Sequence, residues 1–425
     1  MDTIFAVSSG APPAAIAIIR ISGRAAFAAS EVLAGALPRP RTASLRILQD
    51  AAGAVLDRAL VLAFPGPNSA TGEDLVELHV HGGRAVIRAV EAALAAQPGL
   101  RAAEPGEFTR RALLSGRIDL TEAEGLGDLL SAETETQRRA AVMLAEGGLR
   151  RKAEDWTDRV LALAAGVEAA IDFSDEDDVP PERIAAVAVG AGTVAAEMAA
   201  MLATPPVERL RDGLRVVIAG PPNSGKSTLL NALADREAAI VSPISGTTRD
   251  RIEVPIARDG IAYVFTDTAG LADTTDDPIE RIGIARATEA MEGADILLWF
   301  GDDPAPMDAI WVHPRADLPE RGEMPAGRDV AISAADGRGM PALWSLIGAR
   351  AATLLPPPDA VALNQRQRRL IGEASSWLRR AGEESDTLLV AEQLRLAMRS
   401  LHQLTGRSDV EAMLDALFVR FCIGK

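Results

Sequence analysis

The feature that most constrains this chain is a glycine-rich loop at residues 220–227, which reads Gly-Pro-Pro-Asn-Ser-Gly-Lys-Ser. It is a complete G-x-x-x-x-G-K-S phosphate loop. An apolar run, Leu214–Ala219, precedes it and a helical run, Lys226–Leu233, follows it. A phosphate cradle needs this succession of strand end, glycine turn and helix N-terminus, because backbone N–H groups and the helix dipole face the anion. The sequence therefore predicts a P-loop α/β domain that binds a nucleoside triphosphate.

Two downstream motifs indicate which triphosphatase class this is. Lys226 can reach the β- and γ-phosphate oxygens, and the Ser227 hydroxyl can ligate Mg²⁺. Thr248, in Gly-Thr-Thr-Arg-Asp, can complete the Mg²⁺ shell, and Asp-Thr-Ala-Gly at 267–270 favours a GTPase over an ATPase. The expected contacts to phosphates and ions are Asn223, Ser224, Gly225, Lys226, Ser227, Thr228, Ser242, Pro243, Ile244, Ser245, Gly246, Thr247, Thr248, Asp267, Thr268, Ala269 and Gly270.

Recognition of the base rests on a second pair of loops. GTPases carry Asn-Lys-x-Asp after the next strand, and the matching stretch here is Pro314-Arg315-Ala316-Asp317. Asp317 can still accept both guanine N–H donors, and Arg315 can stack on the base as a lysine would. Pro314 lacks the amide, so weakened base affinity stays an open alternative. Ser333-Ala334 matches the short loop that completes guanine recognition.

Composition sets limits on partners and compartment. The 425 residues carry a formal net charge of −16, which argues against a chain that coats nucleic acid but leaves room for a local basic patch. The single cysteine, Cys422, excludes an internal disulfide and fits a reducing compartment. The N-terminus lacks a signal-peptide pattern, and no apolar run approaches a membrane span. We expect a soluble, cytoplasmic protein without a membrane partner.

Periodicity and turn residues predict four segments along the chain: 1–118, 119–211, 212–355 and 356–425. The first is α+β. The second is helical, with a solvated acidic break at 172–178, and the fourth is helical again. The third alternates strand and helix, which implies a parallel sheet inserted into one discontinuous helical domain.

The individual elements follow from the same patterns. In the first segment we expect strands Ala15–Ile21, Leu60–Phe64 and Leu75–Val80 and helix Ala85–Ala96. In the second, helical periodicity covers Glu122–Leu130, Glu135–Ala170 and Ile184–Leu202. In the third, we expect strands at Leu214–Ala219, Ile252–Ile256, Ala262–Thr266, Ile296–Phe300, Ile310–Val312 and Val330–Ile332.

Further motifs occur in order on both sides of the α/β segment. They are Asp2-Thr3-Ile4, Arg20-Ile21-Ser22-Gly23, the run 66–74 (Gly-Pro-Asn-Ser-Ala-Thr-Gly-Glu-Asp), His81-Gly82-Gly83, Pro105-Gly106-Glu107-Phe108-Thr109, Asp119-Leu120-Thr121-Glu122-Ala123-Glu124 and the terminal Phe421-Cys422-Ile423-Gly424-Lys425. With the GTPase motifs, they make essentially the whole chain resemble the tRNA wobble-uridine modification GTPases of the MnmE (TrmE) family.

The resemblance implies a tetrahydrofolate-binding N-terminal domain that also dimerises, a split helical domain and an inserted G domain. It implies an FAD-containing partner of the MnmG (GidA) type, in a heterotetramer or larger assembly. Together they would install a 5-carboxymethylaminomethyl-type group on the wobble uridine, U34, of tRNA. The one-carbon donor would be a 5-formyl- or methylene-tetrahydrofolate.

By match of position, the folate contacts would be Arg20, Glu77, Arg117 and Lys425. A carboxylate such as Glu77 can accept paired donors from a pterin edge, and the cations suit an anionic glutamate tail. For each of them alone, a surface ion pair is the alternative. Cys422 is either a reactive or gating thiol near the folate or a buried small hydrophobe.

The resemblance also bears on hydrolysis. Leu271 follows Gly270 where many small GTPases place a catalytic glutamine, and the family uses a downstream glutamate, matched here by Glu280. Arg249 lies in the switch loop, but the family uses K⁺ in the place of an arginine finger. The K⁺ ligands implied are Asn223, Ser242, Ile244 (through its carbonyl) and Thr247. We expect K⁺-stimulated hydrolysis coupled to pairing of two G domains.

Two other readings remain at this point. A ribosome-assembly or regulatory GTPase switch would carry a similar G domain, but it would lack the folate-domain motifs and the Cys-Ile-Gly-Lys ending. A folate-dependent transferase with a vestigial G domain would explain Pro314, but the intact phosphate and switch motifs weaken it.

Overall fold

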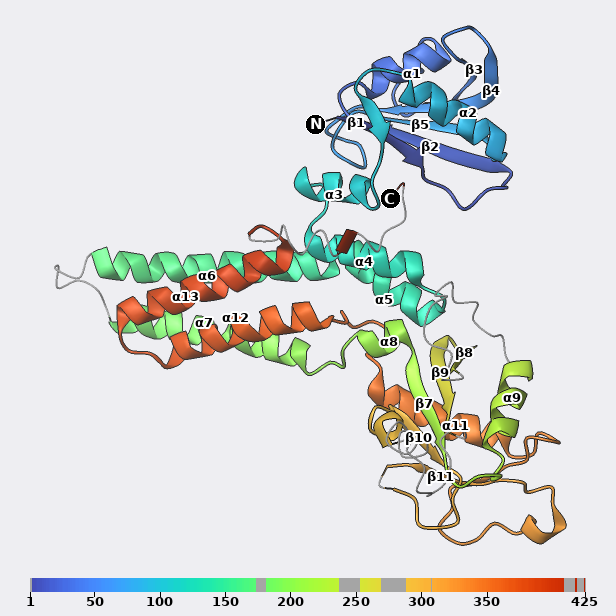
Figure 1. Cartoon of the computed structure of the whole chain (residues 1–425). Helices are drawn as coiled ribbons and strands as arrows, with labels where there is room; N and C mark the ends of the chain where they lie inside the picture. The colour runs from blue at the N-terminus through green and yellow to red at the C-terminus, as the bar shows by residue number, and fades with distance from the viewer. Residues whose placement is uncertain are drawn as a thin grey trace, which may run out of the picture. The chain divides into compact units, whose positions relative to one another are not determined.

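The computed structural model describes residues 2–172, 181–236, 253–268, 288–306 and 308–408, and residues 417, 418 and 424 (Figure 1). The chain forms two compact units. The first combines residues 1–127, 145–154 and 401–425, and the second combines residues 128–144 and 155–400. The four segment boundaries expected from the sequence remain a prediction.

A six-stranded sheet with the order β3-β4-β5-β2-β1-β6 forms the centre of the first unit. Neighbouring strands are antiparallel except for β1 and β6. The strands and the helices α1 and α2 have the bounds β1 Thr3–Val7, β2 Ile16–Ser22, α1 Ala26–Ala34, β3 Ser44–Gln49, β4 Val55–Phe64, β5 Leu75–His81, α2 Arg84–Ala95 and β6 Leu100–Ala102. The predicted strands and helix are confirmed as β2, β4, β5 and α2, while β1, β3 and β6 are additional.

The two faces of this sheet differ in burial. Inward residues such as Ile19, Val61 and Leu78 are fully buried in a core that includes residues of α1 and α2. The alternate residues on the other face are more accessible, as with Leu45 and Leu60 at 61% and 42% exposure. This alternation is the period-2 pattern of a half-buried strand. It leaves one face of the sheet open for contacts.

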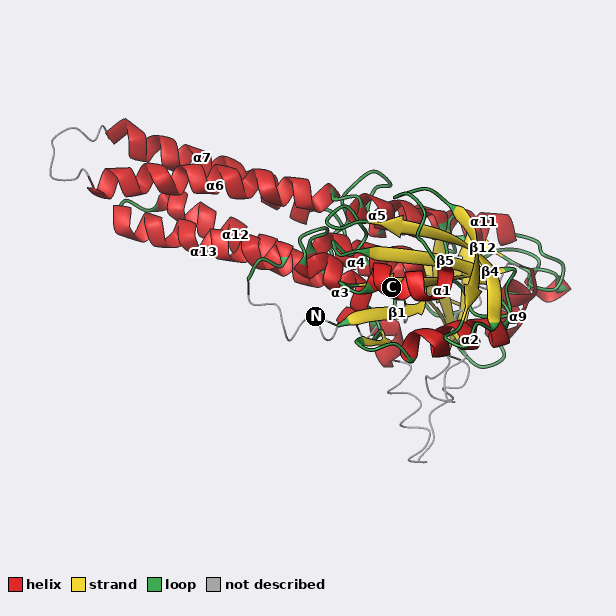
Figure 2. Cartoon of the chain, turned by 90° about the horizontal axis from the view of Figure 1, so that it is seen from above, coloured by secondary structure: helices red, strands yellow, loops and turns green. Residues whose placement is uncertain are grey.

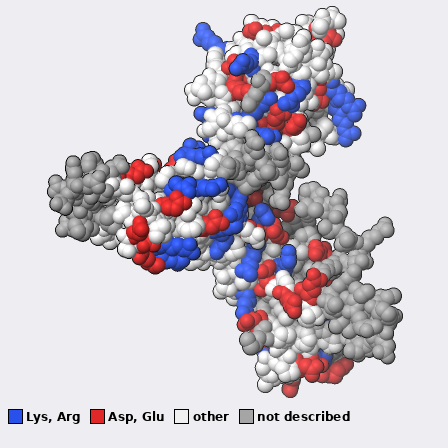
Figure 3. Space-filling model, turned by 60° about the vertical axis from the view of Figure 1, so that its left-hand side comes forward, with Lys and Arg blue, Asp and Glu red and all other residues white. Residues whose placement is uncertain are grey.

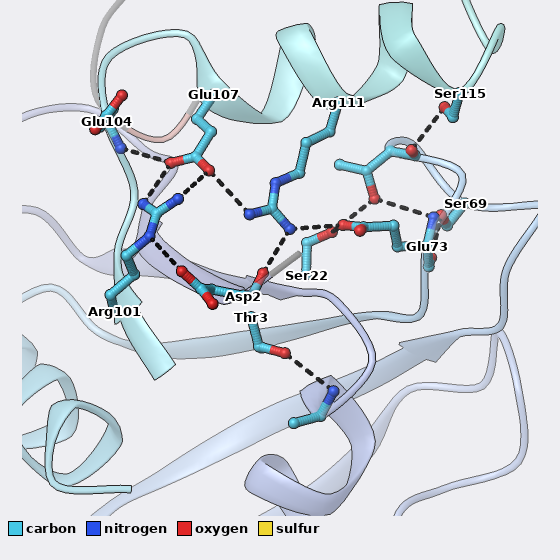
Figure 4. Close-up of polar contacts among 12 residues, drawn as sticks. Asp2, Thr3, Ser22, Ser69, Glu73, Arg101, Glu104, Glu107, Arg111 and Ser115 are labelled. Atoms are coloured by element: carbon cyan, nitrogen blue, oxygen red, sulfur yellow. Dashed lines mark hydrogen bonds and ion pairs between the residues drawn. The ribbon is translucent and has the colours of Figure 1, made fainter. Parts of the chain in front are cut away.

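A buried ion network holds the edge of this unit together (Figure 4). The Arg111 side chain is 5% exposed and donates to Glu73, Glu107 and the carbonyl oxygen of Asp2, each at 2.9 Å. Arg101 donates to both carboxylate oxygens of Glu107, at 2.7 and 2.8 Å. Glu107 and Arg111 belong to α3 (Glu107–Leu114), so the network connects this helix to the start of β1 and to the loop before β5.

Helices dominate the middle and the end of the chain. Their bounds are α4 Leu120–Ser131, α5 Glu135–Ala145, α6 Gly148–Asp172, α7 Pro181–Leu202, α12 Gln365–Glu383 and α13 Thr387–Thr405. The helical periodicity predicted over Glu135–Ala170 is confirmed, and it is divided between two helices, α5 and α6. Gly147 lies between them with a φ of 78°, a left-handed conformation that ends a helix.

The long helices α6, α7, α12 and α13 run side by side (Figure 2). In the described part of the chain, one stretch, Ala185–Leu202 of α7, is long and apolar enough to cross a membrane by length and composition. The expectation that no apolar run approaches the length of a membrane span is therefore wrong for this stretch. α7 packs against α12, and 28% of the Ala185–Leu202 stretch is buried.

The bundle carries charges of both signs on its surface. Figure 3 shows basic and acidic side chains interspersed on the helices visible there. The ion pairs of these helices include Arg369–Glu373 and Arg395–Glu392, each on one helix, and Arg159–Glu197 between two helices. Alternating charge of this kind is typical of a solvated helix face.

A second six-stranded sheet has the order β12-β11-β10-β7-β9-β8. The elements are α8 Glu208–Asp212, β7 Leu214–Ala219, α9 Lys226–Arg236, β8 Glu253–Arg258, β9 Ile261–Asp267, β10 Ile296–Trp299, β11 Ile310–His313, η1 Pro319–Arg321, β12 Val330–Ala331 and α11 Met340–Leu354. All six predicted strands are confirmed. The expected parallel sheet is confirmed for β7, β9, β10, β11 and β12, while β8 pairs with β9 in an antiparallel hairpin closed by Asp259 and Gly260.

The buried network predicts a specific response to acid. Burial opposes ionisation of Glu107, but hydrogen bonds from Arg101, the Glu104 N–H and Arg111 lower its pKa to about 2. In an unfolded chain the pKa of a glutamate is about 4.3, so this group stabilises the fold at neutral pH and the contribution disappears as pH falls towards 2. Between pH 6 and pH 3 we expect this group alone to account for about 1 to 2 kcal/mol of lost unfolding free energy.

Urea denaturation of Glu107→Gln and of wild type at pH 6 and pH 3 measures this contribution. The variant should be less stable at pH 6 and should lose less stability on acidification. The exposed Glu31→Gln in α1 is the control. Equal acid sensitivity in wild type and Glu107→Gln would contradict the assignment.

Candidate functional site

The phosphate loop lies between β7 and α9, where the sequence predicts it. Gly220 has a φ of 145°, and a Cβ there would meet the Cβ of Phe300 at 2.9 Å, so only glycine fits beside the end of β10. The Lys226 ammonium donates to the carbonyl oxygens of Gly220 and Pro221 at 2.8 and 2.7 Å. With 3% exposure, Lys226 holds a positive charge over the loop at the helix N-terminus.

The chemistry of the loop suits a magnesium triphosphate. The Ser227 hydroxyl donates to Asp267 Oδ2 at 2.5 Å, which places two hard oxygen donors together. Ser224 is 7% exposed, and its hydroxyl has no hydrogen-bond partner among the described residues. A buried hydroxyl without a partner is costly, and a phosphate oxygen would satisfy it. The residues present therefore fit Mg²⁺ and phosphate.

Strand register explains why Ser227 meets Asp267. β7 and β9 are parallel neighbours, and Ile218 of β7 lies opposite Asp267 at the end of β9. Thr268 then donates from its N–H and its hydroxyl to the Ile218 carbonyl, at 3.2 and 2.9 Å. Carboxyl ends of parallel strands form the ligand edge of an open α/β sheet. The two motifs are thus brought to one edge.

A cavity of about 190 Å³ lies beside the phosphate loop. Apolar groups such as Phe300, Leu318 and Ile332 line it, and Asp317 provides a carboxylate; the remaining lining residues are Gly225, Thr228, Leu229, Pro314, Arg315, Ala334 and Ala335. Flat apolar walls with one convergent carboxylate suit a heteroaromatic base. Five residues predicted from the sequence, Gly225, Thr228, Arg315, Asp317 and Ala334, line this single cavity.

Arg315 connects the base side of the cavity to the phosphate side. Its guanidinium donates to the carbonyl oxygen of Asn223 in the phosphate loop. Asn223 and Arg315 both have left-handed backbones, with φ values of 59° and 58°. Ser333 is fully buried and accepts from the Asp336 N–H, so its side chain shapes the second base loop from within.

The candidate folate residues lie in the first unit. Arg20 and Glu77 are directly opposite each other on β2 and β5, and Arg20 Nε donates to Glu77 Oε1 at 2.8 Å. They therefore form one ion pair rather than two independent ligands. The carbonyl oxygen of Gly424 accepts from the Ser8 hydroxyl at 2.7 Å, next to the end of β1. Arg117 is exposed, with its Cγ 3.4 Å from where a Cβ on Gly72 would lie.

Part of the predicted site lies outside the described residues. These residues are Ser242, Pro243, Ile244, Ser245, Gly246, Thr247, Thr248, Arg249, Ala269, Gly270, Glu280, Cys422 and Lys425.

Sequence reasoning missed several residues that complete the geometry. Phe300 and Ile332 form walls of the base cavity, and periodicity identified them only as strand residues. Arg338 bonds across the two base loops, and no motif indicates it. Its role is recognisable only from the tertiary structure, because its contact is with Ala316 in the other loop.

Comparisons with known proteins cover the full length. The family model for the "GTP-binding protein TrmE N-terminus" matches residues 3–117, and the model for the "MnmE helical domain" matches residues 120–422. The "tRNA modification GTPase MnmE" of Erythrobacter litoralis is 55% identical, over 100% of both chains. That of Rhizorhabdus wittichii is 56% identical over 100% of this chain and 97% of the relative, and that of Zymomonas mobilis is 51% identical over 100% of both.

Solved structures match over shorter parts. The Aquifex aeolicus Era structure bound to GDP·AlF4⁻ is 25% identical, covers 38% of this chain and 66% of its own, and gives a TM-score of 0.25. The G domain of the T. maritima FeoB iron transporter is 23% identical, covers 32% of this chain and 98% of its own, and gives a TM-score of 0.24.

Removal of the loop cation should abolish tight nucleotide binding. We expect Lys226→Ala to weaken GTP binding at least about 100-fold, the equivalent of roughly 3 kcal/mol of charge-assisted hydrogen bonding. Isothermal titration calorimetry with GTP and Mg²⁺ measures the change. Lys152→Ala, on the exposed surface of α6, is the matched control. Wild-type affinity in Lys226→Ala would remove this loop from the nucleotide site.

Proposed function

The chain belongs to the MnmE family of tRNA modification GTPases, and on this basis we propose its activating ion, its partner and its product. As a member it is a GTP hydrolase that acts in tRNA modification. We propose that K⁺ activates the hydrolysis and that a flavoprotein of the MnmG (GidA) type is its partner. The product is a 5-carboxymethylaminomethyl-type group on U34, built with a one-carbon unit from 5-formyl- or methylene-tetrahydrofolate.

The observation that carries the hydrolase part is the meeting of Lys226, Ser227 and Asp267 at one sheet edge. Phosphoryl transfer needs positioning and neutralisation of charge on the phosphate oxygens. Lys226 supplies a buried positive charge and exchanges its two loop carbonyls for β- and γ-phosphate oxygens. Ser227 and Asp267 would hold Mg²⁺, the serine directly and the aspartate through water; bound Mg²⁺ neutralises the β- and γ-oxygens. Ser224 donates its hydroxyl to a phosphate oxygen.

Apart from Asn223, the remaining catalytic groups belong to segments outside the described residues. Glu280 orients the attacking water in place of the glutamine that Leu271 replaces, and the Gly270 N–H meets the γ-phosphate. Asn223, Ser242, Ile244 and Thr247 would ligate K⁺, which supplies positive charge beside the β/γ bridge. Thr248 would complete the Mg²⁺ shell.

The folate part rests on the Arg20–Glu77 pair on the open face of the first sheet. The side chains are 27% and 16% exposed, so a ligand can reach both. Glu77 accepts N–H donors from a pterin edge, while Arg20, Arg117 and Lys425 attract its carbonyl or the glutamate tail. Support comes from Gly424, whose carbonyl oxygen accepts from the Ser8 hydroxyl next to the end of β1 in the same sheet. Cys422 gates or reacts at this site.

We further propose that two copies of the chain pair through the first domain. Leu45, Ile47 and Leu60 on β3 and β4 leave 61%, 47% and 42% of their surface exposed on the open sheet face. Exposed apolar side chains gathered on one face favour an interface. The dimer then joins the flavoprotein in a heterotetramer or larger assembly in the cytoplasm, with tRNA as the substrate.

Monovalent cations test the K⁺ proposal. GTP turnover should be at least about tenfold faster in K⁺ than in Na⁺ at equal ionic strength, because the ion acts as a preorganised charge at the transition state. Initial rates of phosphate release measure this.

Glu280→Ala should lower kcat at least about 100-fold with little change in GTP affinity. Equal rates in both salts would contradict the K⁺ proposal, and an unchanged Glu280→Ala rate would contradict the glutamate's role.

Complementation tests the tRNA and folate parts. A strain without the gene should lack the modified U34 nucleoside, as measured by mass spectrometry of digested tRNA. Wild type should restore it, whereas Lys226→Ala and Arg20→Ala should not, the first through loss of GTP and the second through loss of folate. Unaltered nucleosides in the deletion strain would favour a regulatory GTPase instead. Restoration by Arg20→Ala would separate this arginine from the folate site.

A further inference from the structure

Two loops form the base side of the cavity. Residues 314–317 follow β11, and residues 333–338 follow β12, its parallel neighbour in the sheet. In GTPases with Asn-Lys-x-Asp, the asparagine amide is available to hold such loops together. Pro314 stands at that position here and has neither a side-chain donor nor a backbone N–H. Another group must fix the loop that carries Asp317.

Ala316 is tied to the second loop through both of its backbone groups. Its N–H donates to the carbonyl oxygen of Ile332 at 3.0 Å. Its carbonyl oxygen accepts from Arg338 Nη1 at 2.9 Å. That carbonyl and the N–H of Asp317 belong to one planar peptide unit. Fixing the Ala316 carbonyl therefore fixes the direction in which the chain enters Asp317.

The Arg338 side chain is itself held in place. Asp336 Oδ2 lies 3.2 Å from Arg338 Nη2, and Asp336 Oδ1 accepts from the Arg338 N–H at 2.9 Å. The Arg338 carbonyl accepts from the Ser333 N–H at 2.9 Å, which closes the loop into a ring. Hydrogen bonding from the Arg338 N–H lowers the pKa of Asp336, so this carboxylate stays charged. A charged partner orients a guanidinium that is otherwise 62% exposed.

We propose that Arg338 is a positioning residue for guanine recognition, which clamps the Ala316 carbonyl and thereby holds Asp317 at the base in place of the missing asparagine. The proposal rests on Asp317 as the reader of guanine, through its N1–H and 2-amino group. Hypoxanthine has the N1–H but lacks the 2-amino group. A misplaced Asp317 loses the second hydrogen bond first, so the ratio of guanine to hypoxanthine affinity reports the position of this carboxylate.

The test uses the full chain with GDP and IDP, titrated by calorimetry. Arg338→Ala should weaken GDP binding about tenfold and IDP binding about twofold, so that the preference for guanine falls about fivefold. Arg338→Lys should recover part of the preference for guanine, because the lysine ammonium can still donate to the Ala316 carbonyl. It cannot reproduce the two guanidinium contacts, to Ala316 and to Asp336, at once. Arg350→Ala, an exposed arginine of α11 that lies 3.9 Å from Asp308, is the control and should bind as wild type.

Two results would overturn the proposal. One is an unchanged ratio of GDP to IDP affinity in Arg338→Ala; if both affinities fall equally and the melting temperature falls too, Arg338 has a structural role only. The other comes from Asp317→Asn: if this variant keeps the wild-type GDP to IDP ratio, the aspartate does not read the base. That last result would reject the premise itself, independently of Arg338.

Discussion

The parallel alignment of β7 beside β9 joins chain segments that are 40 residues apart at one edge of the second sheet. Because both strands end at the same level, the Ser227 hydroxyl and the Asp267 carboxylate meet. The Lys226 ammonium donates to the carbonyl oxygens of Gly220 and Pro221 in the phosphate loop at the same edge. Hydrophobic residues of the strands, including Val216 and Phe265, are fully buried and keep this register. The charged edge is therefore placed by an apolar core that contains none of its chemistry.

In the first unit, several residues of the motifs that carry the family resemblance hold the fold together rather than face a ligand. Asp2, Glu73 and Glu107 belong to three of those motifs and all three hydrogen-bond to Arg111. A carboxylate and a guanidinium that are buried together must remain paired, since either one alone would carry a large desolvation cost. Glu73 and Glu107 are therefore committed to Arg111, whereas the side chains of Arg20 and Glu77 are 27% and 16% exposed to solvent.

A helical segment outside the sheet contacts the far end of β9. The Thr136 hydroxyl of α5 donates to the Gly260 carbonyl at 2.5 Å, and Gln137 Nε2 donates to the carbonyls of Leu210 and Arg211 at 3.1 and 3.0 Å. The β8–β9 hairpin, whose second strand ends at Asp267, is thus hydrogen-bonded to α5 at its turn. α5 therefore contacts both the turn before β9 and the end of α8 through hydrogen bonds to backbone carbonyls.

The amino-acid sequence by itself determined the phosphate loop, the six strands of the nucleotide domain and the family, because apolar periodicity and glycine spacing are local properties of the chain. It also indicated Asp317 and Arg315, whose motif survives the loss of its asparagine. Only the tertiary structure decided that β8 runs antiparallel, that Glu135–Ala170 breaks at Gly147, that Arg20 and Glu77 form one pair, and that Arg338 reaches Ala316. Each of these depends on register, on a backbone conformation or on a contact between distant residues, and such relations are fixed by packing rather than by any short stretch of sequence.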